Sequence, residues 1–164
     1  MSPTLAIGAS PIGGAVKAAF TGYAGIRVAM QHGEANTAAF ARARGDSLLA
    51  STGLRDPATG LTWGRVIERG IEGSMRRDMA NQLSLSATAS ASELEGKRTA
   101  SNQRLRAGLS LSKNWQMRGF KYFAAGPFYG YESYDNNRNE FTFGNGGYFS
   151  PQEYHRIGVG LNFQ

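Results

Sequence analysis

Cysteine is absent from the 164 residues, and the chain has no apolar run long enough to form a membrane-spanning helix. Without cysteine, neither a disulfide framework nor a thiolate metal site can form. A spanning helix would need about 20 consecutive apolar residues. Residence in a membrane would therefore require a closed β-barrel, the other structure that pairs every backbone N–H and C=O group in hydrocarbon.

Charged residues are also scarce. They make up 18% of the chain, against roughly 25% in an average globular protein. The 22 glycines favour strands and turns, because Gly weakens a helix interior by about 1 kcal/mol relative to Ala. The net charge of +6 would suit nucleic-acid binding, but the arginines are scattered along the chain, so no nucleic-acid partner is expected.

Signatures of catalysis and of metal binding are missing. His32 and His155 are the only histidines. Segment 135–140 begins like a calcium loop but has Glu140 where that loop requires Gly. Segment 144–149 departs from the dinucleotide-binding pattern at its final Gly. We therefore expect no catalytic residue, no metal site and no cofactor, and predict that the protein is not an enzyme.

The sequence does contain a clear period of two. Within 82–92, Leu and Ala at odd positions alternate with Ser and Thr at even positions, which predicts a strand with one apolar and one polar face. Segments 104–112 and 156–163 repeat this pattern. About eight strands are predicted in all, which makes the fold class all-β and antiparallel. The weaker members of the set are 5–10, 16–21, 26–31, 63–76 and 120–134.

The predicted connections differ in length between the two ends of the strands. If the last strand ends in the periplasm, the short links 22–25, 77–80 and 114–118 lie on the periplasmic side. The links 34–62, 94–100 and 135–153, longer on the whole, then lie outside. Short periplasmic turns and long external loops are typical of outer-membrane barrels. The pattern therefore favours an antiparallel transmembrane β-barrel.

The polar strand faces are expected to meet water. Unpaired polar groups in a dry core would cost about 1–3 kcal/mol each, so a wet barrel lumen suits them better. A soluble sandwich that binds carbohydrate could also turn these faces to solvent, and this alternative stays open. The residues predicted to line a lumen are Gln82, Ser84, Ser86, Arg104 and Arg106.

The two ends of the chain carry opposite signals about targeting. Residues 156–163 resemble the C-terminal signal of outer-membrane proteins, with apolar residues at alternate positions ending in Phe163, although Gln164 follows it. The first residues show neither the charged region nor the apolar region of a signal peptide. We therefore expect an outer-membrane protein given as a fragment or in a mature form.

Two longer stretches are more specific than periodicity. Residues 46–64 and 141–152 resemble the C-terminal domain of the cellulose synthase outer-membrane channel subunit, and 7–13 is a shorter match. The resemblance implies that residues 1–164 form an outer-membrane barrel domain, or a segment of one, from which the family's periplasmic helical repeats are absent. The family domain is longer, so whether this chain closes alone or forms part of a larger barrel stays open.

The resemblance also implies partners: a cellulose chain, outer-membrane lipid, the periplasmic helical repeats and an inner-membrane synthase. The leading prediction is a passive channel that exports a polysaccharide, expected to be cellulose. The alternative is a small plugged barrel that serves as a membrane anchor or assembly module and does not conduct. Small barrels of about eight strands have filled interiors.

Aromatic and glycine-rich residues are the candidates for contact with the exported chain or for a gate. Tyrosines and Trp63 could present flat surfaces to sugar rings, although an interfacial aromatic girdle is the competing explanation. Glycines beside aromatics in 144–149 could form a pliable gate, or only a tight turn. The candidates are Trp63, Tyr129, Tyr131, Asn145, Gly146, Gly147, Tyr148 and Phe149.

Overall fold

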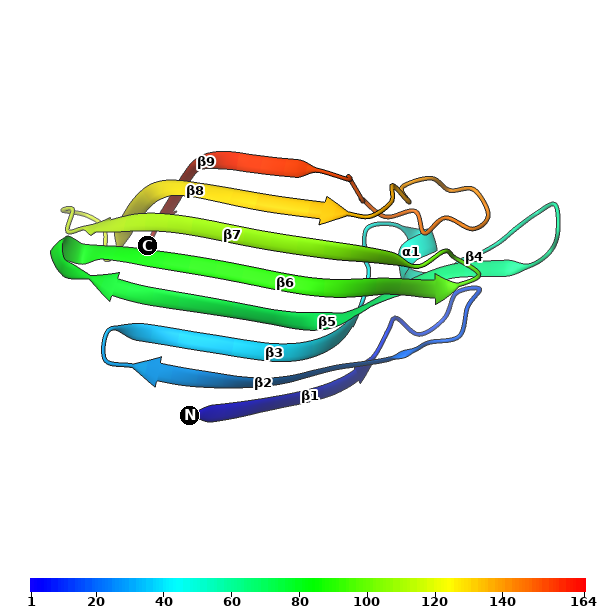
Figure 1. The fold of residues 1–164 in the computed structure, drawn as a ribbon, viewed down its shortest axis with the longest axis horizontal. Helices are drawn as coiled ribbons and strands as arrows, with labels where there is room; N and C mark the ends of the chain where they lie inside the picture. The colour runs from blue at the N-terminus through cyan, green and yellow to red at the C-terminus, as the bar shows by residue number, and fades with distance from the viewer.

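The computed structural model describes residues 1–164 as one antiparallel sheet of nine strands (Figure 1). Strands that follow each other in the sequence are neighbours in the sheet, apart from the two-residue β4 (Leu54–Arg55), which pairs only with β5. In sheet order the long strands are β1 (Ser2–Ala9), β2 (Phe20–Met30), β3 (Gly33–Ala43), β5 (Thr62–Met79), β6 (Leu83–Lys97), β7 (Asn102–Trp115), β8 (Phe123–Tyr134) and β9 (Tyr154–Phe163).

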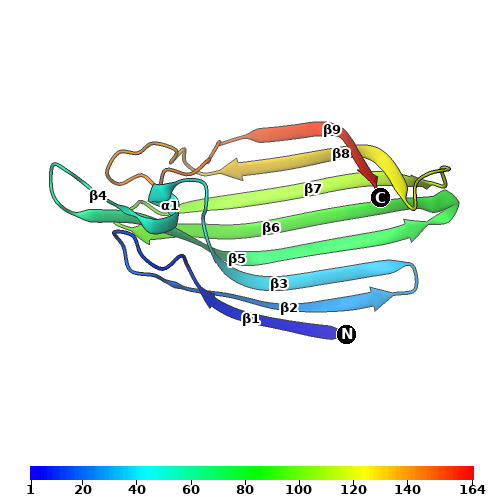
Figure 2. The same ribbon diagram turned by 180° about the vertical axis from the view of Figure 1, so that it is seen from behind.

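The prediction of an all-β antiparallel fold is confirmed, but the predicted closure into a barrel is not found. β1 and β9 form the two edges of the sheet, and each has a neighbour on one side only. The sheet is a curved, open surface (Figures 1 and 2). Alternation in the sequence determines which face a side chain occupies, but it does not determine what pairs with the edge strands.

Two predictions near the N-terminus are wrong. The segments 16–21 and 26–31 were expected to be separate strands joined by a turn at 22–25, whereas β2 runs unbroken through that turn. Its Gly22 and Gly25 pair with β3, opposite Ala41 and Ala38. Apart from Gly33, β3 lies within the predicted external loop 34–62. It was not predicted because its alanine-rich sequence shows little contrast between alternate positions.

The two ends of the sheet differ in the length of most of their connections, as predicted, although the predicted short link 22–25 lies inside β2. One end has the short turns 31–32, 80–82 and 116–122, of which 80–82 is a single 3₁₀ turn. We call it the short-turn end. The other end has the long connections 10–19 and 135–153, the segment between β3 and β5 with its helix α1 (Leu48–Thr52), and one short turn, 98–101. Figure 2 shows α1 lying against one face of the sheet at this end.

The two faces of the sheet are opposite in character. Strand pairing places Ser92, Arg104 and Tyr134 in one row, on the face that α1 covers. The other face carries apolar side chains that nothing covers: Ile7 is 80% exposed and Ile157 is 81% exposed. A soluble sandwich would need a second sheet over this apolar face, and the structure has one long-stranded sheet, so that alternative is not supported.

The exposed apolar side chains form a band of limited height. On β6 it runs from Leu83 to Ala91, a length of about 27 Å at ~3.4 Å per residue. At the loop end it stops at an ion pair between Arg69 Nη1 and Glu95 Oε2, 3.0 Å apart. At the strand tilt of roughly 35–45° found in outer-membrane barrels, this length would correspond to a height of about 21 Å, somewhat less than their apolar band of about 25 Å.

The buried core is small and lies at one end. Only 22 of the 164 residues are buried, so few side chains of this sheet are fully removed from water. The apolar core cluster contains Leu94 and Tyr134 on the strands, with Ala50 of α1 and Tyr148 of the last loop packed over them. None of the helical segments is long and apolar enough to cross a lipid bilayer.

Candidate functional site

Three connections meet over the polar face at the loop end of the sheet. They comprise residues 10–19, residues 44–53 including α1, and residues 135–153, and we call them together the cap. Each part overlaps one of the three stretches that carry the family resemblance. α1 begins at Ser47, whose hydroxyl accepts a hydrogen bond from the Ala50 amide at 3.0 Å, an N-cap that fixes the start of a short helix.

Arg65 joins the first part of the cap to the second. Its backbone has a positive φ of 51°, its side chain is only 3% exposed, and no carboxylate lies among its hydrogen-bond partners. A buried guanidinium needs acceptors for all its donors, and here they come mostly from backbone carbonyls. The acceptors are Ser10 Oγ at 2.6 Å, Pro11 O at 2.8 Å, Val16 O at 2.9 Å, Gly13 O at 2.5 Å and Thr52 O at 3.5 Å.

Asp46 joins the second part to the third. Its Oδ2 accepts a hydrogen bond from the Phe149 amide at 3.1 Å and pairs with Arg44 Nη2 at 2.6 Å. Beside it, Gly147 has a positive φ of 62° and packs so closely on α1 that a Cβ there would lie 2.9 Å from Leu49 Cδ2. Only glycine combines this backbone conformation with this close contact.

Tyr148 is the side chain that closes the cap over the sheet. Its ring is 2% exposed and lies 6.2 Å from the ring of Tyr134 and 5.7 Å from the guanidinium carbon of Arg44. Burial raises the pKa of the Tyr148 hydroxyl, so the phenol is uncharged at neutral pH. The cap thus places an aromatic side chain directly against the polar face.

An ionic network lies beneath the cap, with Glu68 at its centre. This carboxylate is 1% exposed. Glu68 Oε1 accepts from Arg104 Nη1 at 2.9 Å and from Ser92 Oγ at 2.8 Å. Its other oxygen lies 3.3 Å from both Arg42 Nε and Arg44 Nη1. The network therefore connects β3, β5, β6 and β7 across the polar face.

The predicted lumen residues fall into three groups. Ser84 and Ser86 lie on the polar face toward the short-turn end, opposite Ser112 and Ser110. Arg106 and Arg104 lie on the same face, but Arg104 is buried in the ionic network and is not free to face a lumen. The fifth candidate, Gln82, lies in the 3₁₀ turn with a positive φ of 61°, beyond the wall of the sheet.

The predicted aromatic candidates also lie in different parts of the structure. Tyr129 and Tyr131 lie opposite Leu109 and Ala107, on the apolar face. There the Tyr129 hydroxyl lies 2.8 Å from Nδ1 of His155. This placement favours the interfacial girdle over contact with an exported chain. A second aromatic group on the short-turn side, missed from the sequence, is formed by Trp115, Phe120, Phe123 and Phe163.

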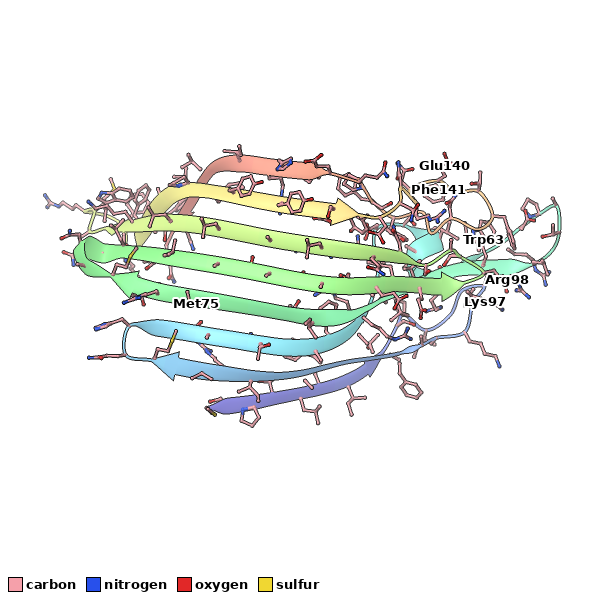
Figure 3. All side chains as sticks on the ribbon, viewed as in Figure 1. Trp63, Met75, Lys97, Arg98, Glu140 and Phe141 are labelled. Carbon is pink, nitrogen blue, oxygen red and sulfur yellow. The ribbon has the colours of Figure 1, made fainter.

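The remaining candidates belong to the cap or its rim. Trp63 is 5% exposed, and its ring lies 5.7 Å from that of Phe143. Gly146, like Gly147 and Tyr148, is buried. Phe149 is 53% exposed and packs against the Tyr154 ring at 5.4 Å, while Asn145 donates to Thr142 Oγ1 at 2.8 Å. Figure 3 shows Trp63, Arg98 and Phe141 at this end and Met75 toward the other.

These features define a class of protein: a single antiparallel sheet with an exposed apolar face, and a polar face whose loops fold inward at one end. A family profile described as the C-terminus of cellulose synthase operon protein C matches residues 2–164. The chain therefore belongs to this family, which takes part in bacterial cellulose export and has no known catalytic role.

Individual relatives agree with the family profile. The chain is 32% identical over 122 residues, 74% of its length, to cellulose synthase operon protein C of Xanthomonas axonopodis pv. citri. It is 32% identical over 120 residues, 72% of its length, to the protein of the same name of Pseudomonas fluorescens. With cellulose synthase 1 operon protein C of Komagataeibacter xylinus the identity is 27% over 138 residues, again 72% of this chain. The matched region spans only 8%, 9% and 10% of these relatives.

Proposed function

We propose that this sheet is the wall of an outer-membrane β-barrel, with its polar face lining the passage through which cellulose leaves the cell. The observation that carries the proposal is that, in a member of a cellulose export family, the apolar face of the sheet is exposed while charged side chains are buried on the polar face. In water, apolar residues turn inward. In a lipid bilayer an outward apolar band and a polar interior are the stable arrangement.

The exposed edges support a membrane barrel only if they become paired. β1 and β9 each leave one row of backbone groups without a strand partner, and an open edge does not occur within the hydrocarbon of a bilayer. The proposal therefore requires that both edges be paired in the membrane. The even number of long strands makes β1 and β9 antiparallel to each other, so their directions suit an antiparallel barrel.

The composition of the polar face suits an uncharged polysaccharide. Toward the short-turn end it presents the hydroxyls of Ser84, Ser86, Ser110 and Ser112. Hydroxyl groups both donate and accept hydrogen bonds, so a sliding glucan could exchange one partner for the next at low cost. At the loop end, the cap lies over the same face and would limit passage.

One further function is favoured by a specific observation. Glu68, Arg104 and Tyr148 fill the polar face beneath the cap and are 1%, 8% and 2% exposed. A barrel filled in this way could serve as a membrane anchor or assembly module without conducting. In the export proposal the same residues belong to a closed gate.

Single-channel recording separates the two functions. The chain would be refolded in detergent and inserted into a planar bilayer, beside an Asp46→Ala variant that lacks the bond to Phe149. Export through a gated passage predicts currents that are open for a larger fraction of the time in the variant. Two folded but silent proteins would support the anchor, whereas equal currents in both would contradict it and would show that the bond between Asp46 and Phe149 does not gate the passage.

The family membership suggests partners for the complete protein. We propose that periplasmic helical repeats deliver the polymer to the short-turn end, and that an inner-membrane synthase supplies it. In a strain whose own channel gene is deleted, a full-length relative carrying this chain as its C-terminal domain should restore cellulose secretion. Secretion of other polymers without cellulose would contradict the proposed substrate.

A further inference from the structure

Phe128 occupies an unusual position on the polar face. It lies on β8 between Ser110 of β7 and Gly158 of β9, on the opposite face from its neighbour Tyr129. The ring leans over the glycine: a Cβ at position 158 would lie 2.9 Å from two of its carbons. Phe128 is nevertheless 37% exposed, so this ring presents aromatic surface among polar residues.

Three other aromatic side chains of this face are already occupied. The guanidinium of Arg42 lies 3.9 Å from the centre of the Phe40 ring, which is 7% exposed. Tyr134 and Tyr148 are buried beneath the cap, at 3% and 2% exposure. Phe128 has no such cover. It lies away from the cap, toward the short-turn end.

Phe128 borders a pocket of about 320 Å³, within the range of roughly 300–1,000 Å³ found for ligand sites. Gly126, also in the lining, lets β8 lie close against β7, because a Cβ there would lie 1.8 Å from the Leu111 carbonyl oxygen. Its polar lining includes Ser84, Ser86, Ser110, Ser112 and Asn162.

The charge of the pocket argues for a neutral ligand. Arg76 is the one charged residue in its lining. Its guanidinium is already engaged, with Nε 3.1 Å from Asp78 Oδ1 and Nη2 donating to Ser84 Oγ at 3.4 Å. A neutral ligand with apolar faces and hydroxyl edges matches an aromatic ring bordered by serine and asparagine, because each part meets its chemical counterpart.

We propose that Phe128 and the surrounding hydroxyls form a binding subsite for a β-1,4-linked glucan. A glucosyl unit would lie with a C–H face against the ring and its equatorial hydroxyls toward Ser110, Ser112 and Asn162. The inference rests on the proposed export function and adds to it a place where the chain is held, near the end opposite the cap.

The test is calorimetric titration of the chain, refolded in detergent, with cellohexaose, and with maltohexaose as the α-linked comparison. Phe128→Ala should weaken cellohexaose binding by at least about fivefold, and Phe128→Tyr should keep it. Phe123→Ala is the matched control, because Phe123 is on the same strand but packs against Trp115 in the apolar-face aromatic group. Folding of every variant is checked by far-UV circular dichroism.

If Phe128→Ala fails to fold, Phe128→Leu keeps most of the apolar volume without the ring and should show the same loss. The inference is overturned if the parent does not bind cellohexaose at millimolar concentration, if it binds maltohexaose equally well, or if Phe128→Ala and Phe128→Leu bind as the parent does. None of these results contradicts the export function, which the channel recordings test separately. Silent bilayers with intact Phe128-dependent binding would instead contradict export through this chain and retain the subsite.

Discussion

The two ends of the polar face show how one surface can be used in two ways. Beneath the cap the face is charged, crowded and dry, with Glu68 and Arg104 at 1% and 8% exposure. Toward the short-turn end it is lined by small hydroxyl side chains and one exposed ring, that of Phe128. The strands are the same at both ends. The difference teaches that the cap loops and the charged strand residues beneath them together close this face at one end.

The largest effect should come from Glu68, whose loss would leave Arg42, Arg44 and Arg104 without their shared carboxylate. Breaking a buried charge cluster by removing one partner typically costs about 3–5 kcal/mol. We expect Glu68→Ala to lower the free energy of unfolding by about that amount, measured by urea titration in lipid vesicles.

The matched control for Glu68 is Glu95→Ala. Glu95 also pairs with an arginine, Arg69, but both side chains are 55% exposed, and such pairs contribute only about 0–1 kcal/mol. Equal losses at positions 68 and 95 would show that the cap end is not a dry site. The polar face would then not differ in dryness between the cap end and the short-turn end.

Arg65 should come next. Arg65→Ala removes the donor that holds Pro11 O, Gly13 O and Val16 O, and each buried acceptor left unsatisfied costs about 1–3 kcal/mol. We expect the segment 10–19 to loosen. Trypsin should then cut after Lys17 at least several times faster, while the strands stay resistant.

Arg98→Ala is the comparison for Arg65. Arg98 also donates to a backbone carbonyl, that of Thr62 at 2.9 Å, but on the exposed surface. Its loss should leave the cutting rate at Lys17 unchanged. If both variants behave alike, Arg65 does not hold the cap.

A smaller effect is expected at Asp46, which links the second and third parts of the cap. A hydrogen bond of a backbone amide to a charged group contributes about 1.5–3 kcal/mol, less here because Asp46 is a quarter exposed. Asp46→Ala should raise amide hydrogen exchange at Phe149 and Tyr148 and leave exchange in β7 unchanged.

Asp56→Ala provides the control for Asp46. Asp56 lies in an exposed loop outside the cap, where hydrogen bonds from Thr59 and Ala58 lower its pKa. The Asp56→Ala substitution should alter amide hydrogen exchange only in residues 56–61. Faster exchange at Phe149 in this variant would mean that the exposed loop and the cap are not independent.

Much of the fold could be predicted because, in several strands, apolar side chains on one face alternate with polar side chains or glycine on the other. In β6, Ser and Thr alternate with Leu and Ala, and in β9 Gly alternates with Ile, Val and Leu. β3 could not be predicted in this way, since Ala occupies positions on both of its faces. The free edges were not predictable either, because pairing at an edge depends on hydrogen bonds of the backbone and not on side-chain pattern.

The site was predictable only in parts. The segments that form the cap were each identified from their sequence, but their meeting point depends on Arg65, whose main acceptors are backbone carbonyls and leave no sequence signal. The ionic network, by contrast, did leave a signal in the sequence. Glu68 and Arg104 occupy even positions on β5 and β7, in phase with the serines of β6, so a charge cluster on the polar face could have been inferred from alternation.

Two serines of β6 give the finest comparison of the two ends. Ser92 and Ser86 lie on the same face of one strand, but Ser92 Oγ donates to Glu68 at 2.8 Å under the cap, whereas Ser86 lines the open pocket near Phe128. Ser92→Ala should cost about 1–2 kcal/mol, because it removes a hydrogen bond to a buried charge. Ser86→Ala should stay within about 0.5 kcal/mol of the parent, as substitutions away from such features do. Urea titration of the two variants side by side measures this difference. Because the chemical change is identical, a larger loss at Ser86 would mean that the short-turn end, and not the cap, holds the polar face together.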